Sequence, residues 1–282
     1  MKNNRLFSFV IVAIAYIVAT AIGLLVYSVL ELDIWLRLLV ADVTATIVIF
    51  VFSVVFGNAS IYDPYWSVQP IVTGVLISIL SSMTVYKVLL LAVVCLWGVR
   101  LTANWAYTFK NLEQQDWRYT MLKEKTGKIY PLINLLGIHL FPTVVVYLCI
   151  LPMVYAITTS YTASVAAYLI LIISLLAVVL QTISDCQMHY YKKHREALGS
   201  FIRIGLWKYC RHPNYLGEIF MWWGVGLSVL FVIPSMWYLL AGAIVNTIMF
   251  LVVSIPMADR RLSKRSGYES YRSETHSLWL FK

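Results

Sequence analysis

The chain has 282 residues, of which 61% are hydrophobic and only 12% are charged, and its mean hydropathy is +0.78. A soluble domain has about half apolar and about a quarter charged residues, so this composition excludes a water-soluble globular protein and indicates an integral membrane protein. The net charge of +9 is explained by membrane topology and does not indicate nucleic-acid binding.

The apolar residues gather in segments that are long enough to cross a bilayer. A span needs about 20 mostly apolar residues, and it must be helical because lipid offers the backbone no hydrogen-bonding partner. Such segments are predicted at 6–28, 34–56, 67–85, 87–107, 131–155, 161–184, 216–232 and 235–256. The last two are short and are separated by a turn at Pro234, so we expect seven to eight spans in an all-α, polytopic transmembrane bundle.

The positive charges are distributed unevenly between the loops. Of the 22 Lys and Arg residues, 19 fall in the N-terminal MKNNR and in the stretches 108–130, 186–215 and 257–282. With eight spans these four stretches lie on one side of the membrane, which the positive-inside rule identifies as the cytoplasm. We therefore expect both termini in the cytoplasm, one domain over residues 1–282, and a cytoplasmic cap formed by the three longer stretches.

Two other kinds of feature are not expected. The first apolar segment is too long for a cleaved signal, and no cleavage motif follows it, so it is predicted to remain as an anchor. The four cysteines have neither CxxC spacing nor a pairing with histidines. Neither a disulfide framework nor a metal site is therefore predicted.

Polar residues cluster where the seventh predicted span begins, in the stretch RHPNYLGE at 211–218. Asn214 and Glu218 are four residues apart and follow Pro213, a favoured first-turn residue, so their side chains share one helical face. Such a pair can also serve only as a cap with a favourable charge near the helix dipole. In the preceding span a polar stripe recurs at helical spacing; it consists of Gln181, Asp185, His189 and Lys192 or Lys193.

These residues match the chemistry of a nicotinamide dinucleotide. Its carboxamide and ribose hydroxyls would meet amide and acidic side chains, and its phosphates would meet Arg and Lys. The glycine-rich turn of the usual dinucleotide fold is missing, because GVGLS at 224–228 lies inside a span with no strand before it. Any such cofactor would need another scaffold.

Longer stretches of the sequence resemble a known family. They are GLWKYCRHPNYLGEIFMWWGVGL, the ISDCQ at 183–187 before it, the tail GYESYRSETHSLWLF, NASIYDPYWSVQP at 58–70, and LWGVRLTANWAYTF with EQQDWRY between 96 and 119. Together they resemble the steroid 5-alpha-reductase superfamily, and most closely its bacterial branch that is described as a domain of unknown function. The resemblance covers roughly residues 40–280.

The resemblance implies NADPH-dependent reduction of a carbon–carbon double bond that is conjugated to a ketone. The asparagine, glutamate and aspartate that bind the cofactor in the family correspond to Asn214, Glu218 and Asp185. Arg211 and Tyr215 flank the same site. The cations near the family's phosphate contacts are Lys192, Lys193, Arg203, Arg260 and Arg261, and the clustered arginines favour NADPH over NADH.

At the substrate end the sequence departs from the steroid reductases. Those enzymes hold the ketone with a glutamate and a tyrosine on early helices, whereas here the comparable positions carry Asp63 and Trp97. Asp63, kept protonated by burial, is the expected donor to the carbonyl oxygen, with Tyr62, Tyr65 or Arg100 as a second donor. The apolar substrate would enter from the membrane lipid. The departure leaves open whether it is a 3-oxo-4-ene steroid, another isoprenoid enone or an unsaturated acyl derivative.

The same residues allow other interpretations. A membrane methyltransferase of the isoprenylcysteine type also carries an RHPxY element and would bind S-adenosylmethionine, and a lipid-binding protein without catalytic activity would have a similar composition. Asp42 and Arg100 could pair only to lock helices together. DWRY at 116–119 is either an interfacial anchor with an ion pair or a cofactor contact. The bacterial branch indicates a plasma membrane, and the oligomeric state is not predicted.

Overall fold

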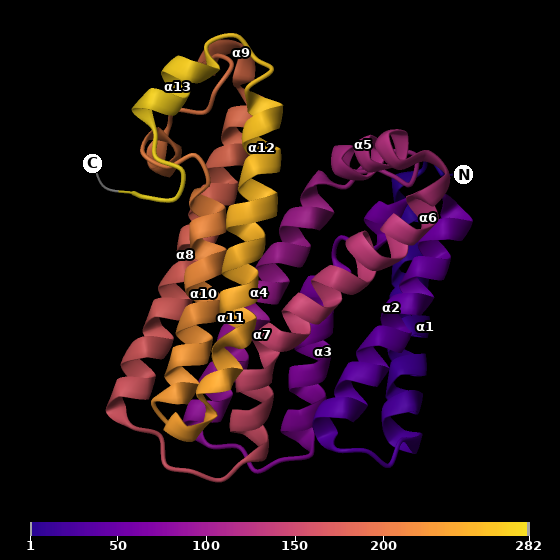
Figure 1. The fold of residues 1–282 in the computed structure, drawn as a ribbon, viewed down its shortest axis with the longest axis vertical. Helices are drawn as coiled ribbons and strands as arrows, with labels where there is room; N and C mark the ends of the chain where they lie inside the picture. The colour runs from indigo at the N-terminus through magenta and orange to yellow at the C-terminus, as the bar shows by residue number, and fades with distance from the viewer. Residues whose placement is uncertain (1, 281–282) are drawn as a thin grey trace. The chain divides into compact units, whose positions relative to one another are not determined.

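The computed structural model describes residues 2–280. The regular secondary structure of these residues is helical, and they contain no β-strand. Their β-type pairing consists of an isolated bridge between Cys210 and His276. The all-α prediction is confirmed. Figure 1 shows the helices. Their bounds are α1 Arg5–Val29, α2 Ile34–Phe56, α3 Tyr65–Ile79, α4 Val85–Thr108, α5 Trp117–Thr126, α6 Tyr130–Ile133, α7 Phe141–Thr158, α8 Val165–Lys193, α9 Arg195–Leu198, α10 Pro213–Leu230, α11 Ala241–Met249, α12 Ile255–Leu262 and α13 Tyr268–Glu274.

Several joins between these helices are 3-10 or π-helical. Two π-helical segments, Asn134–Leu140 and Phe250–Ser254, connect α6 to α7 and α11 to α12. A 3-10 segment, Pro234–Leu240, precedes α11 and contains the predicted turn at Pro234. The chain therefore stays helical through these joins, and α5 to α7 and α11 to α12 belong to longer helical stretches.

Six helical stretches in the part of the chain that the structure describes are long and apolar enough to cross a membrane. They are Arg5–Val29, Ile34–Phe56, Val85–Thr108, Trp117–Thr158, Val165–Lys193 and Pro234–Leu262. The other two predicted spans correspond to α3 and α10, which have 15 and 18 residues. α3 is shorter than the about 20 residues of a typical span, and α10 begins with polar residues. The six apolar stretches are compatible with an integral membrane protein.

The chain forms two compact units, and both are discontinuous in sequence. Unit 1 contains the residues up to Leu80 and Trp97–Tyr147, and unit 2 contains Ser81–Leu96 and the residues from Leu148 onward. Helices α4 and α7 contribute to both units because each is divided near its middle. The single domain expected over residues 1–282 stays a prediction.

In unit 1, α1 and α2 pack closely where small side chains meet. A Cβ atom at Gly23 would lie 3.3 Å from the carbonyl oxygen of Ala41 and 3.4 Å from the Cβ of Ala45. Small residues at such positions let the backbones of membrane helices approach one another. This packing fixes the position of α2 along α1, and therefore the position of the side chains on α2 along the axis of the helix pair.

The turn between α2 and α3 is fastened to the loop before α5. Asn58 accepts a hydrogen bond from the backbone nitrogen of Ser60 at 2.8 Å, and its Nδ2 donates to the carbonyl oxygen of Leu112 at 2.8 Å. The Ser60 hydroxyl accepts from the backbone nitrogen of Asp116 at 2.8 Å. These bonds hold the start of α5 beside the turn that carries Asp63.

In unit 2, α8 packs along α10, and the two helices run side by side in Figure 1. A Cβ atom at Gly217 would lie 2.9 Å from the carbonyl oxygen of Ala177, and one at Gly224 would collide with Ser174. The Ser174 hydroxyl also donates to the carbonyl oxygen of Met221 at 3.0 Å. The two glycines thus permit a close approach of the helices.

The C-terminal tail of unit 2 is tied to the loop before α10. The backbone nitrogen of Arg211 donates to the carbonyl oxygen of His276 at 2.8 Å. The backbone nitrogen of His276 donates to the carbonyl oxygen of Tyr209 at 2.9 Å. Phe201 stacks on Tyr271 of α13, with ring centroids 4.8 Å apart. The loop and the tail therefore form one packed structure in unit 2.

This packed structure contains parts of two predicted cap segments, 186–215 and 257–282. The last two residues of the second segment lie outside the described residues. The third segment, 108–130, belongs to unit 1 and forms α5. The cytoplasmic location of all three segments stays a prediction.

Candidate functional site

The N-terminal end of α10 carries the predicted asparagine and glutamate. The helix begins at Pro213, as the sequence indicates, and Asn214 is half-buried one turn before Glu218. Glu218 is only 5% exposed, and its Oε1 accepts a hydrogen bond from Nε1 of Trp222 at 2.9 Å. A buried carboxylate held by a buried indole has a fixed orientation. It therefore forms a preorganised polar group inside the helix pair.

The register of α8 against α10 places Asp185 at the level of this polar end. Gly224 contacts Ser174 and Gly217 contacts Gln181, so the two helices run antiparallel. One further turn along α8 leads to Asp185, and one further turn along α10 leads to Pro213. Asp185 therefore lies at the same depth as the start of α10, where Asn214 follows. The polar stripe of α8 and the polar start of α10 therefore belong to helices that pack against each other.

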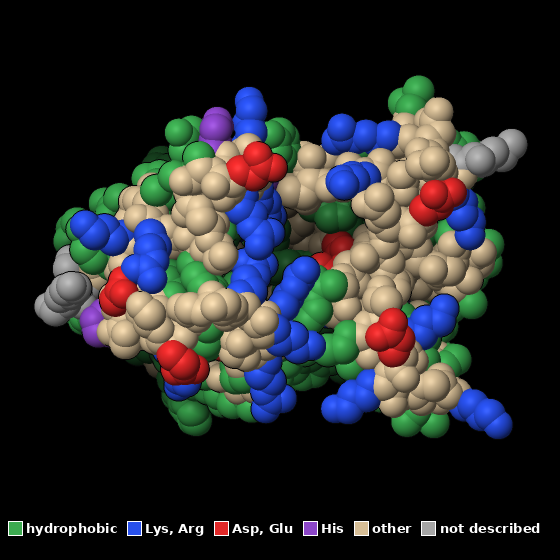
Figure 2. Space-filling view, turned by 90° about the horizontal axis from the view of Figure 1, so that it is seen from above, with side chains coloured by type: hydrophobic (Ala, Val, Ile, Leu, Met, Phe, Trp, Pro, Cys, Tyr) green, Lys and Arg blue, Asp and Glu red, His purple; other side chains and the backbone are tan. Residues whose placement is uncertain are grey.

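Basic side chains lie near Asp185, which is half-buried on α8. Asp185 interacts electrostatically with His189 and with Lys192, and Lys192 interacts with Arg261 of α12. Lys192 and Arg261 are exposed, so both can reach a ligand in solvent. Figure 2 looks onto the end of unit 2 that carries α13, where blue Lys and Arg side chains gather. An acid flanked by exposed cations can bind both hydroxyl and phosphate groups.

Arg211 is buried, and its side chain contacts the protein's own tail. Its guanidinium donates to the carbonyl oxygen of Thr275, and its Nη2 lies 3.3 Å from Oδ2 of Asp259. His212 Nε2 lies 3.0 Å from the other oxygen of the same carboxylate. Arg211 and His212 therefore both contact Asp259, and these contacts join the start of α10 to α12.

The remaining predicted cofactor residues have different surroundings. Tyr215 stacks with His212 at 5.2 Å and contacts Phe250 at 4.8 Å between ring centroids. Arg203 forms an ion pair with Glu274 of α13. Arg260 is exposed on α12, next to Arg261. Arg260 is therefore close in sequence to Arg261, which interacts with Lys192. Arg203 instead contacts the C-terminal tail through Glu274.

The sequence analysis did not single out Asn246, an amide buried in unit 2. Asn246 is 4% exposed on α11, and its Nδ2 has no hydrogen-bond partner. The next residue, Thr247, accepts a hydrogen bond from Nε1 of Trp223 at 2.9 Å. This bond places α11 beside α10 at the level of Trp223. An amide inside the predicted span 235–256 was the signal that could have identified it.

Unit 1 contains a second polar group, centred on Asp63. The hydroxyl of Tyr119, from the first turn of α5, donates to Oδ1 of Asp63 at 2.5 Å. Asp63 lies in the turn before α3 and is half-buried. Burial raises the pKa of Asp63 to about 6, although the nearby Arg118 guanidinium and the Tyr119 hydrogen bond oppose the rise. A carboxyl with this pKa carries a proton for part of the time near neutral pH.

The donors that the sequence suggested beside Asp63 have other partners. The hydroxyl of Tyr62 shares a hydrogen bond with Oγ1 of Thr143 at 2.8 Å. The hydroxyl of Tyr65 donates to Oδ1 of Asp42 at 2.8 Å. Arg100 lies half-buried on α4 in the same unit. Tyr119 is thus the side chain that the structure pairs with Asp63, and the sequence analysis did not assign this partner.

The stretch DWRY at 116–119 explains how Tyr119 reaches Asp63. Asp116 caps α5 by accepting from the backbone nitrogen of Arg118 at 2.8 Å, and it also forms an ion pair with the Arg118 side chain at 2.8 Å. An ion pair was part of one of the two interpretations of this stretch, and the other interpretation, a cofactor contact, stays a hypothesis. The cap starts the helix so that the residue three positions later turns back toward the α2–α3 turn. A tyrosine just after a capping aspartate was the available sequence signal.

Comparison with known proteins places both polar groups inside one family. A family model described as "Protein of unknown function (DUF1295)" matches residues 49–275, a range that contains Asp63, Tyr119, Asp185 and Glu218. No curated protein and no solved structure matches the chain significantly. The match covers most of the chain and agrees with the branch of unknown function that the sequence stretches resemble. The chain belongs to the DUF1295 family of proteins of unknown function.

Proposed function

We propose that the chain is a membrane-embedded reductase of the steroid 5-alpha-reductase superfamily, which uses NADPH to reduce the carbon–carbon double bond of an apolar enone. The observation that carries the proposal is the hydrogen bond between Asp63 and Tyr119. An acid and a tyrosine are the pair by which the superfamily holds the ketone. In this sequence Trp97 stands where the superfamily has its tyrosine. We assign the role of that tyrosine to Tyr119 of α5.

The residues of unit 2 fit a nicotinamide dinucleotide. The buried Nδ2 of Asn246 has no acceptor, which suits the carbonyl oxygen of a carboxamide. Asp185, Asn214 and Glu218 supply acceptors for hydroxyl and amide groups, and exposed cations on α8 and α12 supply donors for phosphates. When bound, NADPH supplies a hydride to the substrate. The group of arginines and lysines favours the cofactor with the additional phosphate.

In this proposal Asp63 and Tyr119 polarise the carbonyl group of the substrate. Negative charge develops on the carbonyl oxygen during reduction, and each donor aimed at that oxygen is worth roughly 3–4 kcal/mol in a water-excluded site. Burial keeps Asp63 protonated for part of the time, so that it can donate. Tyr119 donates its single hydroxyl proton to Oδ1 of Asp63 and so fixes the orientation of the carboxyl, whose own proton is the one aimed at the substrate. The Ser60 side chain also hydrogen-bonds to Asp63, and the Asp63–Tyr119 pair is the first target for mutation.

The membrane topology of the proposal has eight segments. The shorter helices α3 and α10 enter the membrane together with the six apolar stretches, which puts 19 of the 22 Lys and Arg residues on the cytoplasmic side. Both termini are then cytoplasmic, and a bacterial plasma membrane is the location. NADPH arrives from the cytosol, while the enone arrives from lipid, where an apolar compound already partitions.

A ligand titration tests this function against its rivals. We would titrate the purified full chain in lipid nanodiscs with NADPH and, separately, with S-adenosylmethionine, while recording tryptophan fluorescence. Trp222 is bonded to Glu218, so a Trp222→Phe variant identifies how much of the signal comes from the proposed site. NADPH is expected to change the emission at micromolar concentration, and S-adenosylmethionine is not.

Matched variants make the titration specific. The double variant Lys192→Ala with Arg261→Ala is expected to weaken NADPH binding by at least about tenfold, because each cation–phosphate bond is charge-assisted. Lys264→Ala removes another exposed cation from the same tail and is the control. Binding of S-adenosylmethionine without NADPH would identify a methyltransferase. Binding of neither ligand would favour the lipid-binding alternative.

A further inference from the structure

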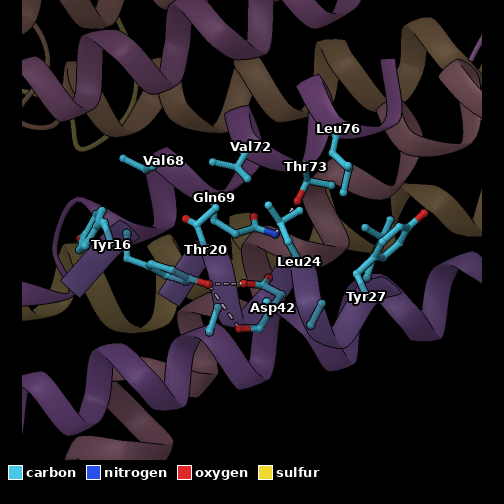
Figure 3. A pocket seen from close by; sticks show the side chains of 15 residues that line it. Tyr16, Thr20, Leu24, Tyr27, Asp42, Val68, Gln69, Val72, Thr73 and Leu76 are labelled. Atoms are coloured by element: carbon cyan, nitrogen blue, oxygen red, sulfur yellow. Dashed lines mark hydrogen bonds between the residues drawn. The ribbon is translucent and has the colours of Figure 1, made fainter. Parts of the chain in front are cut away.

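A pocket opens in unit 1 between α1, α2 and α3 (Figure 3). Its volume is about 540 Å³, counting the space at its open mouth. Because this volume includes open space at the mouth, the pocket encloses only part of a lipid-sized ligand, and the rest of the ligand would extend through the mouth. Its walls are mainly apolar, with aliphatic side chains that include Leu24, Leu38, Val68, Val72 and Leu76, and with three tyrosines, Tyr16, Tyr27 and Tyr65.

Two acceptor oxygens in this pocket have no hydrogen-bond donor. Asp42 is 4% exposed; its Oδ1 accepts from the hydroxyl of Tyr65 at 2.8 Å, while its Oδ2 is buried without a partner. Gln69 donates through Nε2 to the hydroxyl of Thr73 at 2.9 Å, which leaves its buried Oε1 without a partner. Figure 3 shows Asp42 and Gln69 among the side chains that line the pocket, one from α2 and the other from α3.

Buried acceptors without donors are costly in an apolar environment and call for a partner. A hydroxyl group suits Asp42 in either protonation state, because it can donate to a carboxylate and can accept from a carboxylic acid. In the second case its own proton remains available for Oε1 of Gln69. A phospholipid acyl chain would fill the aliphatic part but would leave both oxygens without a donor.

The surroundings of the pocket indicate how its ligand would arrive. Leu24 lines the pocket and is itself 39% exposed, and its neighbour Leu25 is 62% exposed on the outer face of α1. α1 and α2 are among the stretches that are apolar enough to cross a membrane, so exposed aliphatic side chains on them face hydrocarbon. A ligand that enters past Leu24 therefore comes from lipid and has an apolar body.

We propose that this pocket binds an apolar alcohol, of the isoprenoid or sterol type, with its hydroxyl group between Asp42 and Gln69 and its hydrocarbon body along the aliphatic walls. The polar end of this site contains neither Asp63 nor any residue of the nucleotide group, although Tyr16, which also lines the pocket, interacts electrostatically with Asp63. Tyr65 takes part as the donor that holds the Asp42 carboxyl in place.

Photolabelling in nanodiscs tests the proposal. The probe is a primary isoprenoid alcohol that carries a diazirine on its chain, and the matched probes are its methyl ether and its primary amine. Label would be mapped by mass spectrometry of proteolytic fragments. The alcohol is expected to label segments of α1, α2 and α3 about five to ten times more efficiently than the ether, which is the ratio that one buried hydrogen bond provides.

Variants separate recognition of the hydroxyl from filling of the cavity. Asp42→Leu and, separately, Gln69→Leu are expected to remove the preference for the alcohol while labelling by the ether persists, and that labelling also reports an intact pocket. Leu24→Trp is expected to reduce labelling by both probes, whereas Leu25→Trp, its exposed neighbour, is expected to reduce neither. Equal labelling of the unmodified chain by alcohol and ether, a preference for the amine, or label outside these three helices would overturn the proposal. Because NADPH is absent throughout, the outcome does not depend on reductase activity.

Discussion

Tyr119 and Asp63 are 56 residues apart in sequence, and the tyrosine hydroxyl donates to the aspartate at 2.5 Å. The bond joins the first turn of α5 to the turn before α3. It depends on a supporting set of bonds in which Asn58 and Ser60 hold the loop before α5. A carboxyl that is held this way by a phenol has a fixed orientation, and when it is protonated it offers one preorganised donor to an acceptor oxygen.

The first prediction concerns this pair. Tyr119→Phe and Asp63→Asn are each expected to lower the turnover number for enone reduction about a hundredfold, because Asp63→Asn replaces the acidic donor to the developing oxyanion and Tyr119→Phe removes the bond that orients this donor. The affinity for NADPH is expected to stay within about twofold, since the nucleotide residues lie elsewhere in the sequence. NADPH consumption with a panel of apolar enones provides the measurement. Tyr107→Phe, an exposed tyrosine of the same unit, is the control, and a loss of activity there would contradict the assignment.

The second prediction concerns pH. The pKa of Asp63 is raised from 3.8 to about 6 in the folded protein, mainly by burial, so the folded state binds this proton more tightly than the unfolded state does. Its contribution to stability is fully present below pH of about 4 and is lost as the pH rises through about 6. The thermal unfolding temperature of the unmodified chain should therefore fall over this window, more than that of Asp63→Asn.

The rate of catalysis should also depend on whether Asp63 is protonated. Because the proposed donor is the protonated carboxyl, the turnover number is expected to fall as the pH rises above about 6. Asp63→Asn has no proton to lose, and its residual rate should be flat over the same range. An identical pH profile in both proteins would show that Asp63 is not the titrating group.

The third prediction concerns the nucleotide residues of unit 2. Asp185→Ala and Asn214→Ala are expected to weaken NADPH binding by about tenfold or more, because each removes a polar group from the facing ends of α8 and α10. Asn246→Ala should weaken binding also, if its unpartnered Nδ2 meets the carboxamide. Fluorescence titration measures these affinities. Glu196→Ala, an exposed acid on the short helix α9, serves as the control and is expected to bind NADPH normally.

The fourth prediction concerns the close packing of α8 and α10. Gly217→Ala places a Cβ 2.9 Å from the carbonyl oxygen of Ala177, and overpacking of this kind costs about 1–3 kcal/mol. Gly137→Ala is the matched control, since a Cβ there has its nearest neighbour at 3.9 Å. The control is expected to be neutral or slightly stabilising. Thermal unfolding in the same detergent compares the two, and equal stability would show that the helices can separate without cost.

The fifth prediction concerns the link between α10 and the tail. Asp259→Asn weakens the bonds to Arg211 and His212, and leaves the buried Arg211 guanidinium without its carboxylate. We expect a loss of about 2–3 kcal/mol in unfolding free energy and faster cleavage by trypsin at the basic residues after α12. Glu269→Gln changes an exposed acid of α13 and should leave both measurements unchanged. A tail that stays resistant in Asp259→Asn would indicate that the Phe201–Tyr271 packing is sufficient.

The sequence by itself determined the helical architecture and the position of the polar residues along each helix. Apolar segments in a bilayer can satisfy their backbone groups only as helices, so the all-α prediction needed no tertiary information. Pro213 marked the start of α10, and helical spacing identified Asp185 on α8. These features depend on interactions between residues a few positions apart, and such interactions can be read directly from the chain.

Only the tertiary structure decided which polar residues meet. Asp63 was predicted, but its partner Tyr119 comes from α5, because hydrogen bonds from Asn58 and Ser60 fasten two distant loops together. A pairing of Asp42 with Arg100 was one interpretation of the sequence, and the structure shows a hydrogen bond from the Tyr65 hydroxyl to Oδ1 of Asp42. Arg211 was assigned to a cofactor, and its guanidinium contacts Asp259 and the tail. Pairings across tens of residues depend on how whole helices pack, and packing is a collective property that periodicity along a single helix does not contain.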